Sequence, residues 1–133
     1  MLARQDPLHV LGTGEQVRCY THGGDLARGI ATAMEHPGAL NEDFNLSAAR
    51  ATTVRELAEG IWLKVRGPAV PLRVVHDEPF PHDTERQIAA TEKAKQVLGF
   101  DATTSLDDML DEMITWVESA IANGRVPAGR DAV

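Results

Sequence analysis

The segment spanning residues 12–26 constrains the fold more than any other, because it joins a glycine turn, an alternating run and the start of a helix. Gly12 and Gly14 form a Gly-x-Gly turn. A strand places successive side chains on opposite faces. The alternation after the turn therefore predicts one face that carries Gln16, Arg18, Tyr20 and His22. A cation and an aromatic ring beside a tight turn suit an anionic ligand with a planar part, and an ordinary hairpin with a surface arginine is the alternative interpretation.

Composition limits the classes of protein to which the chain can belong. Its 133 residues are enough for one domain with a modest core, and 43% hydrophobic and 25% charged residues are typical of a soluble globular protein. A net charge of −7 disfavours binding to nucleic acid, which depends on neutralising phosphates. A single cysteine, Cys19, excludes an internal disulfide and a multi-thiolate zinc site. We expect no membrane span, no signal peptide and a cytoplasmic location.

Hydrophobic periodicity predicts a mixed α/β chain with four helices and three or four short strands. Helices are expected from Asp25 to about Glu35, from Thr52 or Thr53 to Gly67, from Thr91 to about Leu98, and from Ser105 to the tail after Asn123. Strands are expected over 8–11, 16–21, 43–47 and 71–76, the first two forming a hairpin, with a loop over 77–83. Met1 to Gln5 fit the last turn of a helix.

Capping residues and apolar stripes refine these helices. Asp25 is predicted to cap the first helix, and Thr53 with Glu56 forms a capping box at the second. The apolar stripe of the first helix consists of Leu26, Ile30, Ala33 and Met34. Trp62 and Trp116 lie on apolar stripes of the second and last helices, which favours core packing over stacking on a ligand.

Other groups of polar residues have weaker chemical interpretations. His76, Asp77, His82 and Asp83 offer metal ligands, but their spacing fits no common site type. Cys19 and His22 fall on opposite strand faces, and no third group orients them as a nucleophile and its base. Asn45 and Asp25 are interpreted as turn and cap residues and not as ligands. The acidic residues of the last helix are interpreted as a solvated face: Asp107, Asp108, Asp111 and Glu112.

Four pieces of the chain, in order and with matching gaps, resemble the C-terminal part of the extended short-chain dehydrogenase/reductase family, the nucleotide-sugar epimerases and dehydratases. The resemblance runs from about Leu8 to Ile121. The pieces are Gly12-x-Gly14-x-x-x-Arg18-x-Tyr20; Asp25-Leu26-Ala27-x-Gly29-Ile30; Phe44-Asn45-Leu46 with Thr53-Val54-x-Glu56-Leu57-Ala58; and Lys93-Ala94-x-x-x-Leu98-Gly99-Phe100 with Ser105-Leu106 and Trp116.

The resemblance implies a substrate-binding domain over residues 1–124, followed by a frayed tail over 125–133. Family members hold NAD(P) on a Rossmann domain, whose Gly-x-x-Gly-x-x-Gly signature this sequence lacks. It also lacks the Tyr-x-x-x-Lys pair of acid/base catalysis, because the one tyrosine, Tyr20, has no lysine four residues later. We therefore expect no cofactor on this chain and no catalytic residues, with NAD(P) on a separate Rossmann half and the helix that begins at Asp25 packed on its side.

Site residues follow from the resemblance one by one. Arg18 matches the family's arginine that contacts the substrate diphosphate, and Tyr20 matches the aromatic residue nearby; a guanidinium makes bidentate bonds to phosphate. Arg86 matches a second basic position, and Gln16 lies on the predicted face. The sequence departs from the family at Phe80, where an arginine is usual, and at Ala90, where an aspartate is usual.

The sequence thus predicts the nucleotide-sugar (UDP- or GDP-sugar) binding half of an NAD-dependent epimerase/dehydratase, inactive by itself. Its partners would be the nucleotide-sugar and either a Rossmann chain or a second copy of itself. The alternative is a structural module, or the remnant of a truncated gene, that self-associates without a ligand because faces that once met a Rossmann half remain apolar.

Overall fold

A computed structural model describes residues 6–125 of the chain, which divide into two compact units. The first unit contains residues 6–16, 53–83 and 106–125, and the second contains residues 17–52 and 84–105. Both units are therefore assembled from segments that are distant in the sequence. The predicted last turn of a helix over Met1 to Gln5 lies outside the described residues, as does nearly all of the predicted tail.

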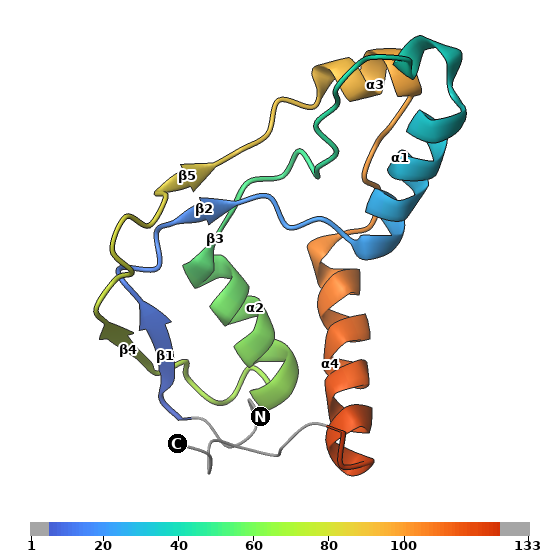
Figure 1. Cartoon of the computed structure of the whole chain (residues 1–133). Coiled ribbons are helices and arrows are strands. Elements are labelled where there is room, and N and C mark those ends of the chain that lie inside the picture. Colours follow the sequence, from blue (N-terminus) through green and yellow to red (C-terminus); the bar gives the residue numbers. More distant parts are fainter. Residues whose placement is uncertain (1–5, 126–133) are drawn as a thin grey trace. The chain divides into compact units, whose positions relative to one another are not determined.

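The sheet of the first unit has two parallel strands, β1 (Leu8–Leu11) and β4 (Val74–Asp77), which lie side by side in Figure 1. Leu8 pairs with Val74 and Val10 with His76. Paired residues of parallel strands share a face, so these four side chains line one side of the sheet. Leu8 and Val10 are both 7% exposed, which identifies that side as the covered one.

Two helices complete the first unit: α2 (Val54–Arg66) and α4 (Leu106–Ala122). The predicted capping box is confirmed, because Glu56 N–H donates to Thr53 Oγ1 (3.0 Å) and Thr53 N–H donates to Glu56 Oε2 (2.7 Å). Trp62 is 4% exposed, and its indole N–H donates to the Val70 carbonyl (2.8 Å). Lys64 joins the two helices by ion pairs with Asp107 (2.9 Å) and Asp111 (2.7 Å) of α4.

The second unit contains α1 (Gly23–Glu35), a 3₁₀ turn η2 (Pro37–Ala39) and α3 (Glu92–Leu98). Its parallel strands are β2 (Val17–Arg18) and β5 (Arg86–Gln87), and β2 also borders β3 (Thr52–Thr53), whose first residue belongs to this unit. The core cluster consists of Ala94, Leu98 and Phe100. Six partly buried residues pack against it: Ala33, Ala39, Phe44, Leu46, Val97 and Ala102.

A buried carboxylate ties the segments of the second unit together. Asp25 is 2% exposed and accepts hydrogen bonds from the Thr104 backbone N–H (2.9 Å) and from Arg28 (2.6 Å). The amide of Thr104, together with the Arg28 guanidinium, lowers the pKa of Asp25 to about 2. The prediction that Asp25 caps α1 is therefore wrong. His22 caps the helix instead, its Nδ1 accepting from Gly24 N–H (3.2 Å).

The predicted hairpin between residues 8–11 and 16–21 is also wrong. Each of the two strands pairs in parallel with a distant partner, β1 with β4 and β2 with β5. A hairpin is the expected pairing of two strands that are close in the sequence. In this fold, each strand pairs instead with a distant strand that the tertiary packing brings beside it. The predicted strand over 43–47 has no ladder among the described residues, and Asn45 Nδ2 donates to the Ala90 carbonyl (3.1 Å).

Two apolar stripes are less buried than their spacing predicts. On α1, Leu26, Ile30 and Met34 are 37%, 48% and 83% exposed, and the small residues Gly29 and Ala33 face the core instead. On α4, Trp116 is 58% exposed, so its predicted place in the core is wrong. The prediction for Trp62 is confirmed. Helical spacing shows which apolar residues recur along one side of a helix, but it does not show whether that side is covered.

Candidate functional site

The candidate site centres on the pairing of β2 with β5, which brings two predicted residues onto neighbouring strands. The Val17 N–H donates to the Glu85 carbonyl (2.8 Å), and the register pairs Val17 with Arg86 and Arg18 with Gln87. Because paired residues of parallel strands share a face, Arg86 lies on the face of Val17 and Arg18 lies on the other face. The two predicted arginines are thus close in the ladder but project to opposite sides of it.

Arg18 and Tyr20 do lie together. Arg18 is partly buried and its Nη1 donates to the Val17 carbonyl (2.9 Å), while Tyr20 is also partly buried. Burial raises the pKa of the Tyr20 phenol above its ordinary value, and the nearby positive charge of Arg18 opposes part of that rise. The phenol therefore stays protonated at neutral pH and can donate a hydrogen bond.

Gln16 belongs to the first unit and is held by its own neighbours. Its Nε2 donates to the Leu11 carbonyl (2.8 Å) and to Asp83 Oδ2 (3.2 Å). Its Oε1 is buried, and no donor within residues 6–125 reaches it. The side-chain amide of Gln16 is thus held in one orientation, and its oxygen has no donor among the described residues.

Gln16 also lines a cavity of about 460 Å³ within the first unit. The lining is mainly apolar and comes from β1, from α2 and from the segment after β4: Leu8, Val10, Leu11, Val54, Leu57, Ala58, Ile61 and Phe80, with His9, Gln16 and Asp83 as the polar members. This volume falls in the range of small-molecule sites. Since Asp83 is acidic and the walls are apolar, the cavity suits an uncharged group better than a phosphate.

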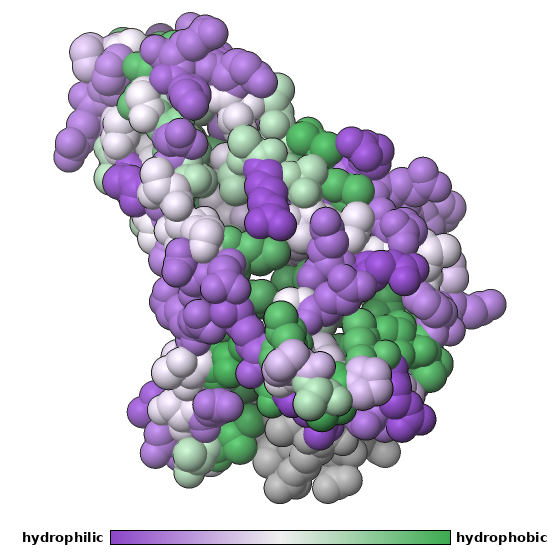
Figure 2. Space-filling view, turned by 180° about the vertical axis from the view of Figure 1, so that it is seen from behind, coloured by the Kyte–Doolittle hydropathy of each residue, from purple (hydrophilic) through white to green (hydrophobic). Residues whose placement is uncertain are grey.

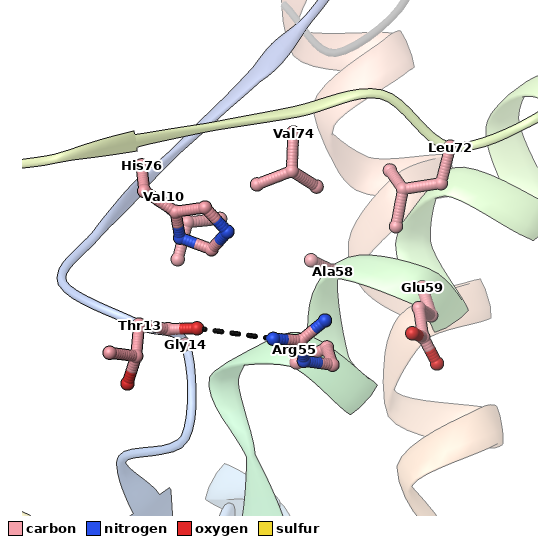
Figure 3. A pocket seen from close by; sticks show the side chains of 9 residues that line it. All are labelled: Val10, Thr13, Gly14, Arg55, Ala58, Glu59, Leu72, Val74 and His76. Atoms are coloured by element: carbon pink, nitrogen blue, oxygen red, sulfur yellow. Dashed lines mark hydrogen bonds between the residues drawn. The ribbon is translucent and has the colours of Figure 1, made fainter.

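A second cavity of the first unit, shown in Figure 3, is too small for such a ligand. It measures about 40 Å³, which is room for water only. Arg55 and Glu59 of α2 lie opposite His76 of β4 across it (Figure 3). Arg55 Nη2 donates to the Thr13 carbonyl (3.4 Å), and His76 Nδ1 donates to the Gly12 carbonyl (2.8 Å). These contacts hold the Gly-x-Gly turn in place.

The metal interpretation of the segment after β4 finds no geometric basis. Within residues 6–125, no three histidine, cysteine, aspartate or glutamate side chains come close enough to hold an ion. Asp77 instead accepts a hydrogen bond from His9 Nδ1 (3.0 Å), and His76 donates to the Gly12 carbonyl of the glycine turn.

No helix in the described part of the chain has the length and apolarity needed to cross a membrane.

The glycine turns among residues 6–125 do not offer the usual cradle for a dinucleotide. A dinucleotide pyrophosphate sits on free backbone amides at a glycine-rich helix N-terminus. The glycines that open α1 are Gly23 and Gly24, and the Gly24 amide is already bonded to the His22 imidazole. The other glycine turn, Gly12 to Gly14, leads into a strand and not into a helix.

A family model described as GDP-mannose 4,6 dehydratase matches residues 1–113. The chain belongs to this family of NAD-dependent epimerases and dehydratases. UDP-glucose 4-epimerase from Bacillus subtilis (strain 168) is 34% identical over 117 residues, which cover 85% of this chain and 32% of that protein. The chain thus spans about a third of the length of this epimerase relative.

Solved structures of epimerases share the fold. The crystal structure of UDP-glucose 4-epimerase from Thermotoga maritima, determined with UDP-glucose, superposes with a TM-score of 0.76 at 28% identity, covering 90% of this chain and 37% of that one. UDP-glucuronic acid 4-epimerase from Bacillus cereus, solved with UDP-glucuronic acid and NAD, gives a TM-score of 0.76 at 23% identity, covering 85% and 35%. The predicted fold, a partial mixed α/β domain of an extended short-chain dehydrogenase/reductase, is confirmed.

Proposed function

We propose that the chain binds a nucleotide-sugar and forms the substrate-binding half of an epimerase or dehydratase. The observation that carries this proposal is the likeness to the Thermotoga maritima epimerase, a structure determined with UDP-glucose, over 90% of this chain. Because the chain corresponds to only 37% of that protein, the activity of the whole enzyme is not assigned to it.

Arg18 is the proposed phosphate ligand. A guanidinium offers a planar fork of donors that matches phosphate oxygens. The phenol of Tyr20 beside it supplies a further donor. Arg86 and Gln16 stay predictions from the sequence.

The test is calorimetry of the full chain with UDP-glucose and with GDP-mannose. Arg18→Ala is expected to weaken binding by about tenfold or more, as for the loss of a charge-assisted hydrogen bond. Arg50→Ala is the matched control, because Arg50 is an exposed arginine of the same unit and outside the proposed site. Equal binding by the wild type and Arg18→Ala, or no binding by the wild type, would contradict the proposal.

Turnover is proposed to require a separate Rossmann half that carries NAD(P) and the catalytic pair. The chain alone, with UDP-glucose and NAD, is expected to form no epimerised product. Epimerisation by the isolated chain would contradict this part of the proposal. A cytoplasmic location remains a prediction.

The exposed stripe of α1 favours a second candidate function, self-association without a ligand. Leu26, Ile30 and Met34 project from one side of the helix, and apolar residues also reach the molecular surface in Figure 2. In the first proposal a Rossmann half would cover this stripe, and in the second another copy of the chain would. Light scattering separates the two, because a monomer that binds nucleotide-sugar supports the first and a dimer that binds none supports the second.

Variants of the stripe sharpen this test. Ile30→Glu with Met34→Glu places charge on the stripe, whereas Ala31→Glu places it on an exposed position about 100° around the helix from Ile30. If copies of the chain associate through the stripe, the double variant becomes monomeric and Ala31→Glu does not.

A further inference from the structure

We propose that Thr21 is a positioning residue, which holds Tyr20 in the orientation in which its phenol meets the ligand. This inference rests on the proposed function and deepens it by naming what fixes one of the two central side chains of the site. Spacing in the sequence does not reveal the role of Thr21, because its partner, the backbone amide of Ala48, lies 27 residues away.

Tyr20 lies in a short stretch of chain between two regular elements. Strand β2 ends at Arg18 and helix α1 begins at Gly23, and Figure 1 shows the chain leading from one to the other. Within residues 6–125, Cys19 to Thr21 belong to no strand ladder. The ladder that holds the backbone of Arg18 therefore does not extend to the backbone that carries the Tyr20 ring.

The Thr21 hydroxyl anchors this stretch to another segment of the same unit. Its Oγ1 accepts from the Ala48 backbone N–H (2.9 Å) and donates to the Cys19 carbonyl (3.4 Å), and it lies 3.4 Å from Ser47 Oγ. Ala48 is 9% exposed, and removing the partner of a buried amide costs more than losing an exposed hydrogen bond. The hydroxyl is thus engaged within the protein, which makes Thr21 an anchor and not a ligand contact.

The anchor acts on Tyr20 through a single peptide bond. That bond is planar, so fixing the backbone of Thr21 restricts the direction in which the Tyr20 side chain leaves the chain. Arg18 donates to the Val17 carbonyl and lies near enough to Tyr20 for its charge to oppose the rise in the pKa of the phenol. Both proposed ligand groups are therefore held before the ligand arrives. Such preorganisation strengthens binding, because fewer groups have to be ordered by the ligand.

The experiment measures UDP-glucose binding by calorimetry on the full-length wild type and on three threonine variants. Thr21→Val keeps the branched shape but removes the hydroxyl, and is expected to weaken binding about three- to tenfold, the cost of ordering one side chain. Thr21→Ser keeps the hydroxyl and is expected to bind as the wild type does. Thr32→Val is the matched control and is expected to change nothing, because Thr32 is a partly buried threonine of the same unit whose hydroxyl donates within α1, to the Arg28 carbonyl (2.9 Å).

Two further measurements distinguish positioning of Tyr20 from a general loss of stability. In a Tyr20→Phe background, which lacks the phenol, Thr21→Val is expected to change the affinity by less than about twofold, because the group that it positions is gone. Incorporated 3-fluorotyrosine gives one signal in fluorine NMR, since the chain has a single tyrosine. Thr21→Val is expected to move this signal towards its position in the urea-unfolded protein, and Thr32→Val is expected to leave it in place.

The outcomes separate this inference from the proposed function. If Arg18→Ala weakens UDP-glucose but Thr21→Val does not, or if Thr21→Val leaves the fluorine signal in place, the nucleotide-sugar function stands and the role of Thr21 is overturned. An equal effect of Thr21→Val with and without the phenol, or loss of the wild-type circular dichroism spectrum, also overturns it, because the hydroxyl then supports the fold and not Tyr20. If the wild type binds no UDP-glucose, or Arg18→Ala binds it equally well, the proposed function itself fails.

Discussion

Helices α1 and α2 have the same length and carry a glycine at the same position, but they pack against different side chains. Each has 13 residues, and the seventh residue of each is a glycine, Gly29 in α1 and Gly60 in α2. A Cβ at Gly29 would lie 2.7 Å from two atoms of the Phe100 ring, whereas a Cβ at Gly60 would lie 3.1 Å from Leu110 Cδ1. The same residue type therefore marks a tight backbone approach to a rigid ring in one unit and to the end of a flexible side chain in the other.

The large residues of the two helices also differ. In α2 the indole of Trp62 is buried and hydrogen-bonded, while in α1 the apolar stripe faces outward and a buried carboxylate, Asp25, holds the segments together. The first unit thus buries the large indole of a helix residue. The second unit combines an apolar cluster around Leu98 and Phe100 with the close approach of Gly29 and with the polar network of Asp25.

The largest expected effect tests the burial in the first unit. Trp62→Ala removes a side chain that is 4% exposed and leaves a cavity, which is expected to cost about 3–5 kcal/mol of unfolding free energy. Trp116→Ala is the matched control, because Trp116 is 58% exposed and is expected to cost about 0.5 kcal/mol or less. Urea unfolding followed by circular dichroism measures both, and equal losses would contradict the assignment of the core.

The second prediction tests the polar network of the second unit. Asp25→Asn is expected to destabilise the protein at pH 7, because the ionised carboxylate accepts from Thr104 and Arg28. The native pKa of Asp25, about 2, lies below the ordinary value of 3.8, so its contribution is complete above pH 3.8 and is lost as the pH falls through 2.

Thermal unfolding as a function of pH checks this sign. The difference between wild type and Asp25→Asn should narrow between pH 4 and pH 2. Asp43→Asn is the control, since the Asp43 side chain is fully exposed. A difference that stays constant down to pH 2 would show that the carboxylate charge does not stabilise the fold.

The third prediction compares the two helix glycines directly. Gly29→Ala forces a Cβ against the buried ring of Phe100, and the overpacking cost of about 1–3 kcal/mol outweighs a helix-propensity gain of about 1 kcal/mol. Gly60→Ala meets only the end of Leu110, so the propensity gain should leave stability unchanged or raised. If the denaturant midpoints of the two variants shift equally, the packing around Gly29 is no tighter than the packing around Gly60.

The smallest effect concerns the start of α2. Thr53→Ala removes the side chain that accepts from the Glu56 amide and is expected to cost about 1 kcal/mol. Thr84→Ala, at an exposed threonine outside any helix, is the control and should leave the melting temperature unchanged. A neutral Thr53→Ala would mean that the capping box contributes nothing to stability.

The sequence predicted local structure better than pairing. The strand at Leu8 to Leu11 and the capping box of Thr53 are confirmed because each depends on a few neighbouring residues. The parallel partners of β1 and β2 could not be predicted, since they lie 60 or more residues away and follow from tertiary packing.

The candidate site divides in the same way. Alternation and resemblance located Arg18 and Tyr20, which the structure does bring together. They could not show that Arg86 faces the other side, because that depends on the register of a two-residue strand. A shift of the strand register by one residue exchanges the two faces of a strand. Only the pairing of β5 with β2 therefore shows which of positions 86 and 87 lies on the face of Arg18.

The interleaving of the two units has a consequence for synthesis on the ribosome. The chain passes from one unit to the other after residues 16, 52, 83 and 105, and the last segment, with α4, belongs to the first unit. The unit that begins first is therefore completed last. The second unit has all its segments once residue 105 has emerged, while β1, β4 and α2 must wait for α4, exposing apolar surface to chaperones in the nascent chain.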